Sequence, residues 1–382
     1  MNKKNIFLVL CAVALLGSFG ISYLLFSKSP LAKISSPLPP TAPSGQIAFD
    51  ESLPKTEPCP LNGAKYSKQQ RDWWEKNNRP LGIMVENHQE ARPQSGINSA
   101  DIVYEAVAEG GITRMLAIYY CQNYVQVGPV RSARTYFLDW ISEYGDSPLY
   151  VHVGGANTPG PANALGQIED YGWGAYNDMN QFSIGFPTFW RDYNRLGRPV
   201  ATEHTMYSTT DKLWKVAKER GLSAKSKDGT PWDEGFVPYE FKEDSPTASS
   251  SSIRIEFWGD KEYNVDWKYD PATNTYLRSH AGSPHTDKNS GKQISAKNVV
   301  VLSMIESSAF DGYEGNAHLL YRNEGSGKAS IFLDGKRING TWSKDSRTDK
   351  TIITDAAGNE IKFNRGKIWF EIVPLDGVVN VK

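Results

Sequence analysis

The chain has 382 residues, with 42 Lys and Arg against 43 Asp and Glu, and a formal net charge of −1 at pH 7. Residues 1–28 contain three lysines and no acid, so the remainder has a net charge of −4. Because no long basic block concentrates positive charge, the composition excludes the usual modes of nucleic acid binding, and we expect no nucleic acid partner.

The first predicted element is a membrane anchor. Residues 6–26 carry no charge, and this run is close to the ~20 residues that cross a bilayer. Lys3 and Lys4 precede it, which predicts a cytoplasmic N-terminus and an exported C-terminal part. A cleaved signal peptide is the alternative, although the apolar run exceeds a typical signal core. We interpret residues 1–28 as a signal anchor or uncleaved signal, and we expect a single-pass protein of the cell membrane whose folded part is extracytoplasmic.

The cysteines bear on this topology. Cys11 follows the bulky Leu10, where lipoprotein processing needs a small residue, so we interpret it as a membrane-buried side chain. Cys59 and Cys121 are the other two cysteines. In an oxidising compartment they are compatible with one disulfide, but spacing alone leaves their pairing open.

A proline-rich tether is predicted at residues 29–60. Eight prolines and little apolar periodicity between residues 27 and 60 favour an extended segment. At ~3.1 Å per residue the tether reaches at most on the order of 100 Å from the membrane.

Residues 61–245 predict an N-terminal α/β domain. Apolar residues fit one face of a helix at 135–144, and apolar runs predict buried strands at residues 79–87, 101–105, 110–120 and 149–153. The last of these strands leads into a glycine-rich turn.

That turn contains Gly154 and Gly155. A strand, a glycine turn and a helix start can present backbone N–H groups to an anion. The sequence matches neither a P-loop nor a dinucleotide fingerprint, so a tight turn is the simpler interpretation. Further along, a helix is predicted to start at Thr209 or Thr210 and to end at Gly221.

Beyond a Ser-rich joint at residues 247–252, residues 253–382 predict a mainly antiparallel β domain. Apolar and polar residues alternate at 253–258 and 263–269, and turn residues separate the later apolar runs. The whole chain therefore predicts an α+β fold, with a mixed layered sheet-and-helix N-terminal domain followed by a mainly antiparallel β C-terminal domain.

The segment at residues 128–134 places charge where a core is expected. It lies between an apolar strand and an apolar helix, and charges near buried segments must be paired or serve a ligand. The charged residues concerned are Arg114, Arg131 and Arg134, with Asp101, Glu105 and Glu109 nearby.

Several motifs occur in a fixed order. They are Asp101-Ile102-Val103-Tyr104-Glu105, Gly110-Gly111-Ile112-Thr113-Arg114, Gly128-Pro129-Val130-Arg131-Ser132-Ala133-Arg134, His152-Val153-Gly154-Gly155, Ser283-Pro284-His285-Thr286-Asp287, Ser295-Ala296-Lys297-Asn298-Val299 and Gly325-Ser326-Gly327-Lys328. Read together, they resemble the YerB-like family of bacterial envelope lipoproteins, over residues 79–375 and in two consecutive domains of unknown function. The resemblance implies an exported, membrane-tethered protein of mixed α and β layers, and it implies no activity. The family commonly carries a lipidated cysteine, from which the setting of Cys11 departs.

The first functional hypothesis is a non-enzymatic envelope module that binds or regulates a cell-wall component or a partner protein. The sequence contains no catalytic triad or cofactor fingerprint, and aromatic residues with arginine are enriched at interfaces. The predicted contacts are the aromatic loop at residues 182–190 and the arginine segment. The ligand-binding candidates are Arg114, Arg131, Arg134, His152, Gly154, Gly155 and Arg191.

The alternative is a phosphotransferase-like or hydrolytic enzyme acting on a phosphate-bearing envelope precursor, because the order of acids and arginines is similar to that of LytR-type proteins. The three arginines would neutralise phosphate, Asp101 with Glu105 would hold Mg²⁺, and Asp192 would act as a base. A structural network that pairs the arginines with Glu105 and Glu109 is the competing interpretation. Catalytic candidates are Asp101, Glu105, Arg114, Asp192 and His204, and no cofactor is expected outside this alternative.

The six histidines lack the i, i+2 and i, i+4 spacings of a local zinc site, so no metal site is predicted. His152 lies on an apolar strand and is expected to be a satisfied core residue. His204 beside Glu203 is a candidate pH-responsive or catalytic pair.

Overall fold

The computed structural model describes residues 49–382 except 122–123 and 249–250. The predicted anchor at residues 6–26, Cys11 and most of the tether lie outside the described residues. Within the part described, no helix is long and apolar enough to cross a bilayer.

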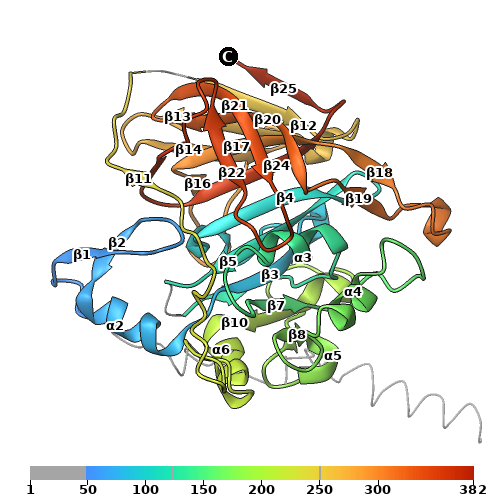
Figure 1. Cartoon of the computed structure of the whole chain (residues 1–382). Helices are drawn as coiled ribbons and strands as arrows, with labels where there is room; N and C mark the ends of the chain where they lie inside the picture. Colours follow the sequence, from blue (N-terminus) through green and yellow to red (C-terminus); the bar gives the residue numbers. More distant parts are fainter. Residues whose placement is uncertain (1–48, 122–123, 249–250) are drawn as a thin grey trace, which may run out of the picture. The chain divides into compact units, whose positions relative to one another are not determined.

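A ten-stranded sheet runs through the described unit (Figure 1). In spatial order its strands are β22 (Ile352–Asp355), β21 (Lys336–Lys344), β20 (Gly325–Leu333), β17 (Asn298–Met304), β24 (Ile368–Pro374), β4 (Ile102–Glu109), β5 (Ile112–Tyr119), β3 (Leu81–Glu86), β7 (Leu149–His152) and β8 (Asp178–Asn180). The first five belong to the C-terminal half and the last five to the N-terminal half. The halves join where β24 pairs in parallel with β4, with Glu371 opposite Glu105.

The central strands of this sheet are buried on both faces. Seven of the eight residues of β4 and all seven of β24 are buried, which explains why both sequences are almost continuously apolar. Glu105 and Glu371 are the acidic exceptions inside these buried stretches, and both are fully buried. The junction of the two halves therefore contains carboxylates that need partners.

The second large sheet belongs to the C-terminal half, which Figure 1 shows in yellow to red. Its strands are β15 (Ser283–Pro284), β14 (Thr275–His280), β13 (Val265–Asp270), β12 (Ser252–Glu256) and β25 (Val378–Val381), with β16 (Ser295–Ala296) also paired to β14. Buried and partly exposed residues alternate along β12 and β14, as expected for strands that bury one face. The predicted α+β class, with a β-rich C-terminal half, is confirmed.

Short strands and helices complete the unit. The smaller pairings are β1 (Lys55–Pro58) with β2 (Lys65–Ser67), β10 (Met206–Thr209) with β6 (Gln126–Val127) and β9 (Trp190–Arg191), β11 (Phe241–Lys242) with β23 (Phe363–Asn364), and β18 (Glu306–Ser308) with β19 (Leu319–Tyr321). The helices are α2 (Lys68–Asn77), α3 (Thr135–Ile141), α4 (Ala164–Asp170), α5 (Gln181–Ile184) and α6 (Thr210–Glu219), with five 3-10 turns at η1 (Gln89–Ala91), η2 (Ile97–Ser99), η3 (Thr202–Thr205), η4 (Lys261–Tyr263) and η5 (Tyr313–Gly315).

The helix predicted from Thr209 or Thr210 is confirmed as α6. Thr209 is its N-cap in extended conformation, and Gly221 follows its end with φ +85°, a left-handed conformation that glycine adopts at low cost. The helix predicted at residues 135–144 is shorter than expected and ends at Ile141.

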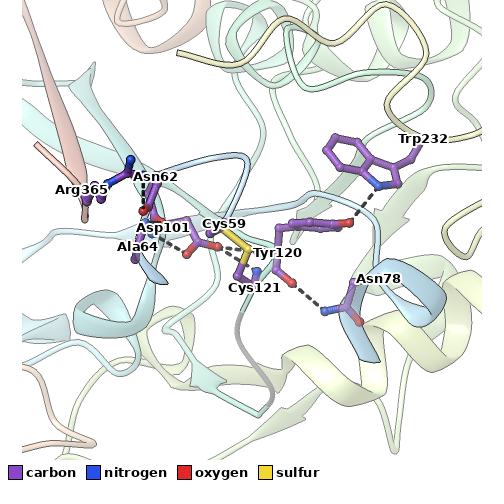
Figure 2. Close-up of a disulfide and its surroundings, with 10 residues drawn as sticks. Cys59, Asn62, Ala64, Asn78, Asp101, Tyr120, Cys121, Trp232 and Arg365 are labelled. Atoms are coloured by element: carbon purple, nitrogen blue, oxygen red, sulfur yellow. Dashed lines mark hydrogen bonds between the residues drawn. A yellow bond between two sulfur atoms is a disulfide. The ribbon is translucent and has the colours of Figure 1, made fainter. Parts of the chain in front are cut away.

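A disulfide links Cys59 to Cys121, the pairing that the sequence left open (Figure 2). The two Cα atoms are 6.0 Å apart, and the bond closes a separation of 62 residues. It ties the segment before β2 to the end of β5. Both cysteines are buried, so the bond is part of the core.

Candidate functional site

The candidate site lies where three parallel strands end. β3, β7 and β8 run in the same direction, and their carboxyl ends meet at one edge of the sheet. Ligands of sheets with parallel strands bind outside these ends. The arginine segment crosses this edge: the N–H of Arg131 donates to Met84 O at 2.9 Å, and the N–H of Val153 donates to Arg131 O at 3.0 Å.

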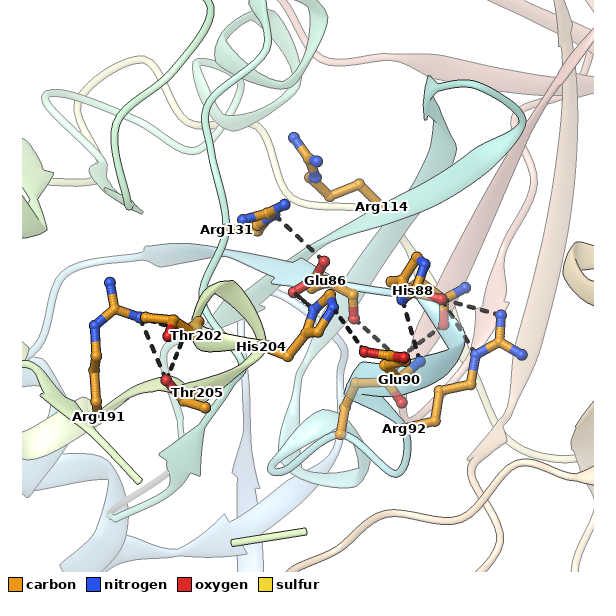
Figure 3. A network of polar contacts seen from close by, with 12 residues as sticks. Glu86, His88, Glu90, Arg92, Arg114, Arg131, Arg191, Thr202, His204 and Thr205 are labelled. Carbon is orange, nitrogen blue, oxygen red and sulfur yellow. Dashed lines mark hydrogen bonds and ion pairs between the residues drawn. The ribbon is translucent and has the colours of Figure 1, made fainter. Parts of the chain in front are cut away.

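Five side chains gather at this edge, and we call them the open cluster: Glu86, His88, Glu90, Arg131 and His204 (Figure 3). Glu86 is the last residue of β3, and His204 comes from η3. One Glu86 oxygen lies 2.9 Å from His204 Nδ1, and the other lies 3.3 Å from Arg131 Nε. His204 Nε2 lies 3.5 Å from a carboxylate oxygen of Glu90.

The two histidines of the open cluster have different electrostatics. Their rings stack with centroids 4.8 Å apart and planes within 7°. The hydrogen bond to Glu86 raises the pKa of His204 above its ordinary value. Burial, followed by the charge of His204, lowers the pKa of His88. Two adjacent imidazolium ions repel each other, so the cluster favours one charged ring beside one neutral ring.

The three predicted arginines separate into two groups. Arg114 and Arg134 both pair with Glu109, and Arg114 Nη2 lies 2.8 Å from that carboxylate. Both side chains are almost fully buried. The competing structural interpretation therefore applies to these two arginines, whereas Arg131 stands apart and contacts Glu86.

The predicted Mg²⁺ pair of Asp101 and Glu105 is wrong. Four residues along a strand are ~13 Å apart, so the two carboxylates cannot share one cation. The carboxylate of Asp101 accepts bonds from the N–H of Tyr120 at 2.7 Å and from Asn62 Nδ2 at 2.8 Å, beside the disulfide (Figure 2). The Asp101 carboxylate therefore stabilises the core and is not placed to bind a ligand.

Glu105 belongs to a second group, which we call the closed cluster: Glu105, Arg278, His280, His285, Asn87 and Gln94. Glu105 lies 2.5 Å from Arg278 Nη2, and both side chains are fully buried. The expected pairing of Glu105 with the predicted arginines is therefore wrong. The partner comes from β14, more than 170 residues away in the sequence, and spacing gave no sign of it.

The predicted glycine turn is not an open anion cradle. The N–H of Gly154 already donates to Asn180 Oδ1 at 3.2 Å, and Gly155 forms a bridge with Ala133. His152 is fully buried, with Nε2 2.5 Å from Asp178. The expectation that His152 is a satisfied core residue is confirmed, and its alternative as a ligand group is not supported by this geometry.

Arg191, the last residue of β9, and Asp192, which follows it, lie beside η3 and position it. Arg191 Nη1 donates to Thr202 O at 2.5 Å and to Thr205 Oγ1 at 3.3 Å, across the turn that carries His204 (Figure 3). The carboxylate of Asp192 accepts the N–H of Asn194 at 3.1 Å, which caps a turn. These contacts assign Arg191 and Asp192 supporting roles in the described structure rather than the predicted ligand and base roles.

The sequence missed Glu86, His88 and Glu90. Glu86 is the last residue of a buried strand, and His88 and Glu90 come directly after it, so the signal was a run of ligand-type residues at a strand end. His204 pairs with Glu86 instead of its sequence neighbour Glu203, because η3 turns its side chain toward β3.

These features define an α+β protein of two interlocked halves with a polar cluster at a strand-end edge. The N-terminal half matches the domain described as "Protein of unknown function (DUF3048) N-terminal domain" at residues 67–223, and the C-terminal half matches the corresponding C-terminal domain at residues 253–370. The chain belongs to this DUF3048 family.

The YerB protein of Bacillus subtilis is similar to this chain in both sequence and structure. The chain is 31% identical over 325 residues to "Putative lipoprotein YerB" of Bacillus subtilis (strain 168), covering 83% of this chain and 86% of that protein. A crystal structure of the YerB protein from Bacillus subtilis is 28% identical, with a TM-score of 0.68, covering 86% of this chain and all of that one. The resemblance to YerB-like proteins is thus confirmed, and the description of the relative as a lipoprotein indicates an envelope-associated protein.

Proposed function

We propose that the protein is a membrane-tethered, extracytoplasmic module of the bacterial envelope that binds an anionic group of a cell-wall component or an envelope partner at the open cluster. The single observation that carries this proposal is the state of Arg131. Its side chain is 28% exposed, and only Nε approaches an acid, Glu86, at 3.3 Å. Among the described residues, Arg131 Nε is buried without a hydrogen-bond partner.

Arg131 differs in this from its neighbours. Arg114 and Arg134 share the carboxylate of Glu109 and are almost fully buried, so a ligand has little access to them. A guanidinium with unpaired N–H groups at the rim of a strand-end edge can take a phosphate or carboxylate through two parallel bonds. The cluster also offers His204, whose proton is held by Glu86 and which adds positive charge on the same side.

The proposed tether rests on the uncharged run at residues 6–26 and on the envelope association of the relative. Membrane fractionation of the wild type and of Cys11→Ala tests it, because an apolar span retains the chain without a lipid. Loss of Cys11→Ala from the membrane fraction would show that a lipid is the anchor. Protease added to intact cells should digest the C-terminal part, and full protection would contradict the exported topology.

The ligand proposal is tested with the full chain in detergent and purified cell walls. Walls that retain their phosphate polymers are compared with the same walls after hydrolysis of the phosphodiesters. Loss of charge-assisted bonds costs ~1.5–3 kcal/mol, so Arg131→Ala should weaken binding to intact walls by about tenfold or more. Higher salt should also weaken binding of the wild type to intact walls, because salt screens the charge of the partly exposed Arg131.

Arg337→Ala is the matched control. Arg337 is exposed on β21, which lies near the opposite edge of the ten-stranded sheet from β3. Its replacement removes the same charge as Arg131→Ala. Equal binding by Arg131→Ala and Arg337→Ala would contradict the proposal. If the wild type binds intact and hydrolysed walls equally and Arg131→Ala alone binds them more weakly, the anionic group of the ligand is a carboxylate rather than a phosphate.

A further inference from the structure

We propose that His88, Glu90 and His204 form a binding site for a divalent transition-metal cation of the Zn²⁺ type. Each residue offers one ligand atom, and these atoms lie within 4.8 Å of one another. The site is graded in exposure, with His204 buried, His88 half-buried and Glu90 50% exposed, so a cation has both fixed ligands and a route of entry.

His204 is already oriented as a metal-ligating histidine is. Its Nδ1 bonds to Glu86 at 2.9 Å, which leaves Nε2 directed at Glu90, 3.5 Å away. Histidines that bind metals almost always place their second ring nitrogen on a carboxylate or carbonyl, which fixes the ring and strengthens the ligand. Glu86 is therefore a positioning residue in this proposal, because it acts on the cation through His204.

The donor set selects the class of metal. Two imidazoles and one carboxylate suit Zn²⁺ and its first-row neighbours, whereas Ca²⁺ and Mg²⁺ prefer oxygen donors alone. Three protein ligands leave at least one coordination position for water or another group, as in open zinc sites.

Binding requires one local adjustment. The rings of His88 and His204 are parallel, and a metal lies close to the plane of each ligating ring, so His88 must turn. Its Nδ1 accepts the N–H of Glu90 at 3.2 Å, a long bond that a cation can replace. The χ2 torsion of histidine is broad, and the half-buried position of His88 leaves room for rotation.

The charge balance is favourable for a cation. A metal displaces the proton of His204 Nε2, because a ligating imidazole is neutral. Arg131 then offsets Glu86, and Glu90 remains as the uncompensated acid beside two neutral imidazoles. A bound cation would leave the site positive and complement an anion beside Arg131. The metal proposal does not depend on that anion, since none of its three ligands is Arg131.

A second group of ligand-type residues carries no such inference. Cys59, Asp101 and Cys121 also lie close together, but the two cysteines form the disulfide. Asp101 is bonded to Asn62 and to the N–H groups of Tyr120 and Cys121. A disulfide offers no thiolate, which is the form in which cysteine binds metals.

The test is equilibrium dialysis of Zn²⁺ against the full chain in detergent, with Cys11 alkylated so that its thiol does not compete. We expect one tightly bound Zn²⁺ per chain. Glu90→Gln removes a half-exposed ligand with little risk to folding, and it should weaken binding at least tenfold, as should His88→Ala and His204→Ala. Glu203→Gln is the matched control, because Glu203 is exposed and adjacent to His204 but outside the group, and it should bind as the wild type does.

Absence of stoichiometric Zn²⁺, or equal binding by Glu90→Gln and Glu203→Gln, would overturn the proposal. Co²⁺ provides a second readout: visible d–d absorption of the wild type that is lost in Glu90→Gln supports ligation at this cluster, and an unchanged spectrum contradicts it. Arg131→Ala should retain Zn²⁺ while losing wall binding. The outcome for Zn²⁺ is therefore separate from the outcome for the anion.

Discussion

The open and closed clusters are built from the same kinds of side chain, yet the structure assigns them different roles. Each has one arginine and two histidines, with two glutamates in the open cluster and one in the closed cluster. The clusters are linked through the neighbouring residues Glu86 and Asn87. In the closed cluster Glu105 and Arg278 are fully buried, whereas in the open cluster Arg131 is 28% and Glu90 50% exposed.

The partners of each group explain this difference. Glu105 accepts from Thr113, Asn87 and Arg278, and Arg278 also donates to His285 Nδ1 and stacks over Trp369, 4.8 Å from its ring centroid. Burial, followed by the charge of Arg278, lowers the pKa of His280 and of His285 well below the ordinary value, so both rings are neutral. Apart from Arg278 Nε and His280 Nδ1, which are buried without a hydrogen-bond partner among the described residues, the polar atoms of the closed cluster are paired within the protein. Residue type alone therefore does not mark a site.

Glu371 lies opposite Glu105, beside the closed cluster, but does not form an ion pair with Arg278. Burial, followed by the charge of Glu105, raises the pKa of Glu371 well above its usual range and favours its protonated form. Its carboxyl accepts from Trp267 Nε1 at 2.7 Å. Arg278 pairs with Glu105, and among the described residues a second buried pair, Lys344 with Glu143, also joins the two halves.

Arg278→Met in the closed cluster should cause the largest loss of stability. Removing this cation leaves the fully buried Glu105 without its charge partner, which should lower the free energy of unfolding by ~3–5 kcal/mol. Urea denaturation of the full chain measures the change. A loss below about 1 kcal/mol would mean that the closed cluster does not stabilise the junction.

Lys367 differs from Arg278, because among the described residues this buried cation has no carboxylate contact. Its Nζ donates to Ile97 O at 2.7 Å, and burial lowers the pKa of Lys367 from 10.5 to about 7. Between these values the unfolded chain binds more protons than the folded chain, so stability rises with pH. From about pH 7 to about pH 9.5 the contribution is roughly 3 kcal/mol.

Lys367→Met should therefore stabilise the protein at neutral pH and flatten the rise in stability toward alkaline pH. Unfolding free energies of wild type and variant across this range provide the check. A variant that is less stable at neutral pH, with an unchanged slope, would show that Lys367 is charged and paired in the fold.

The smallest effects compare two arginines of one segment. Arg134→Ala removes a buried partner of Glu109, while Arg114 retains the other contact, so we expect a loss of about 1–3 kcal/mol. Arg131→Ala removes a partly exposed side chain without hydrogen bonds and should change stability by no more than about 0.5 kcal/mol. Equal losses in the two melting curves would place Arg131 in the structural group.

The sequence predicted the elements better than the site. The apolar runs of β3, β4, β5 and β7 and the cap of α6 depend on local patterns, which are visible in a sequence. The pairing of β24 with β4 and the contact of Arg278 with Glu105 join residues from opposite halves, and no local period encodes them. Partner choice for Arg114, Arg131 and Arg134 likewise depends on which carboxylate each meets after folding.

The central claim is that the open cluster is the ligand site and the closed cluster is structural. The most direct measurement is an anomalous difference map at the zinc absorption edge from crystals of the protein soaked in Zn²⁺. We expect a peak between His88, Glu90 and His204 and no peak at His280 and His285. A peak at the closed cluster, or an empty open cluster in crystals that hold zinc elsewhere, would contradict it.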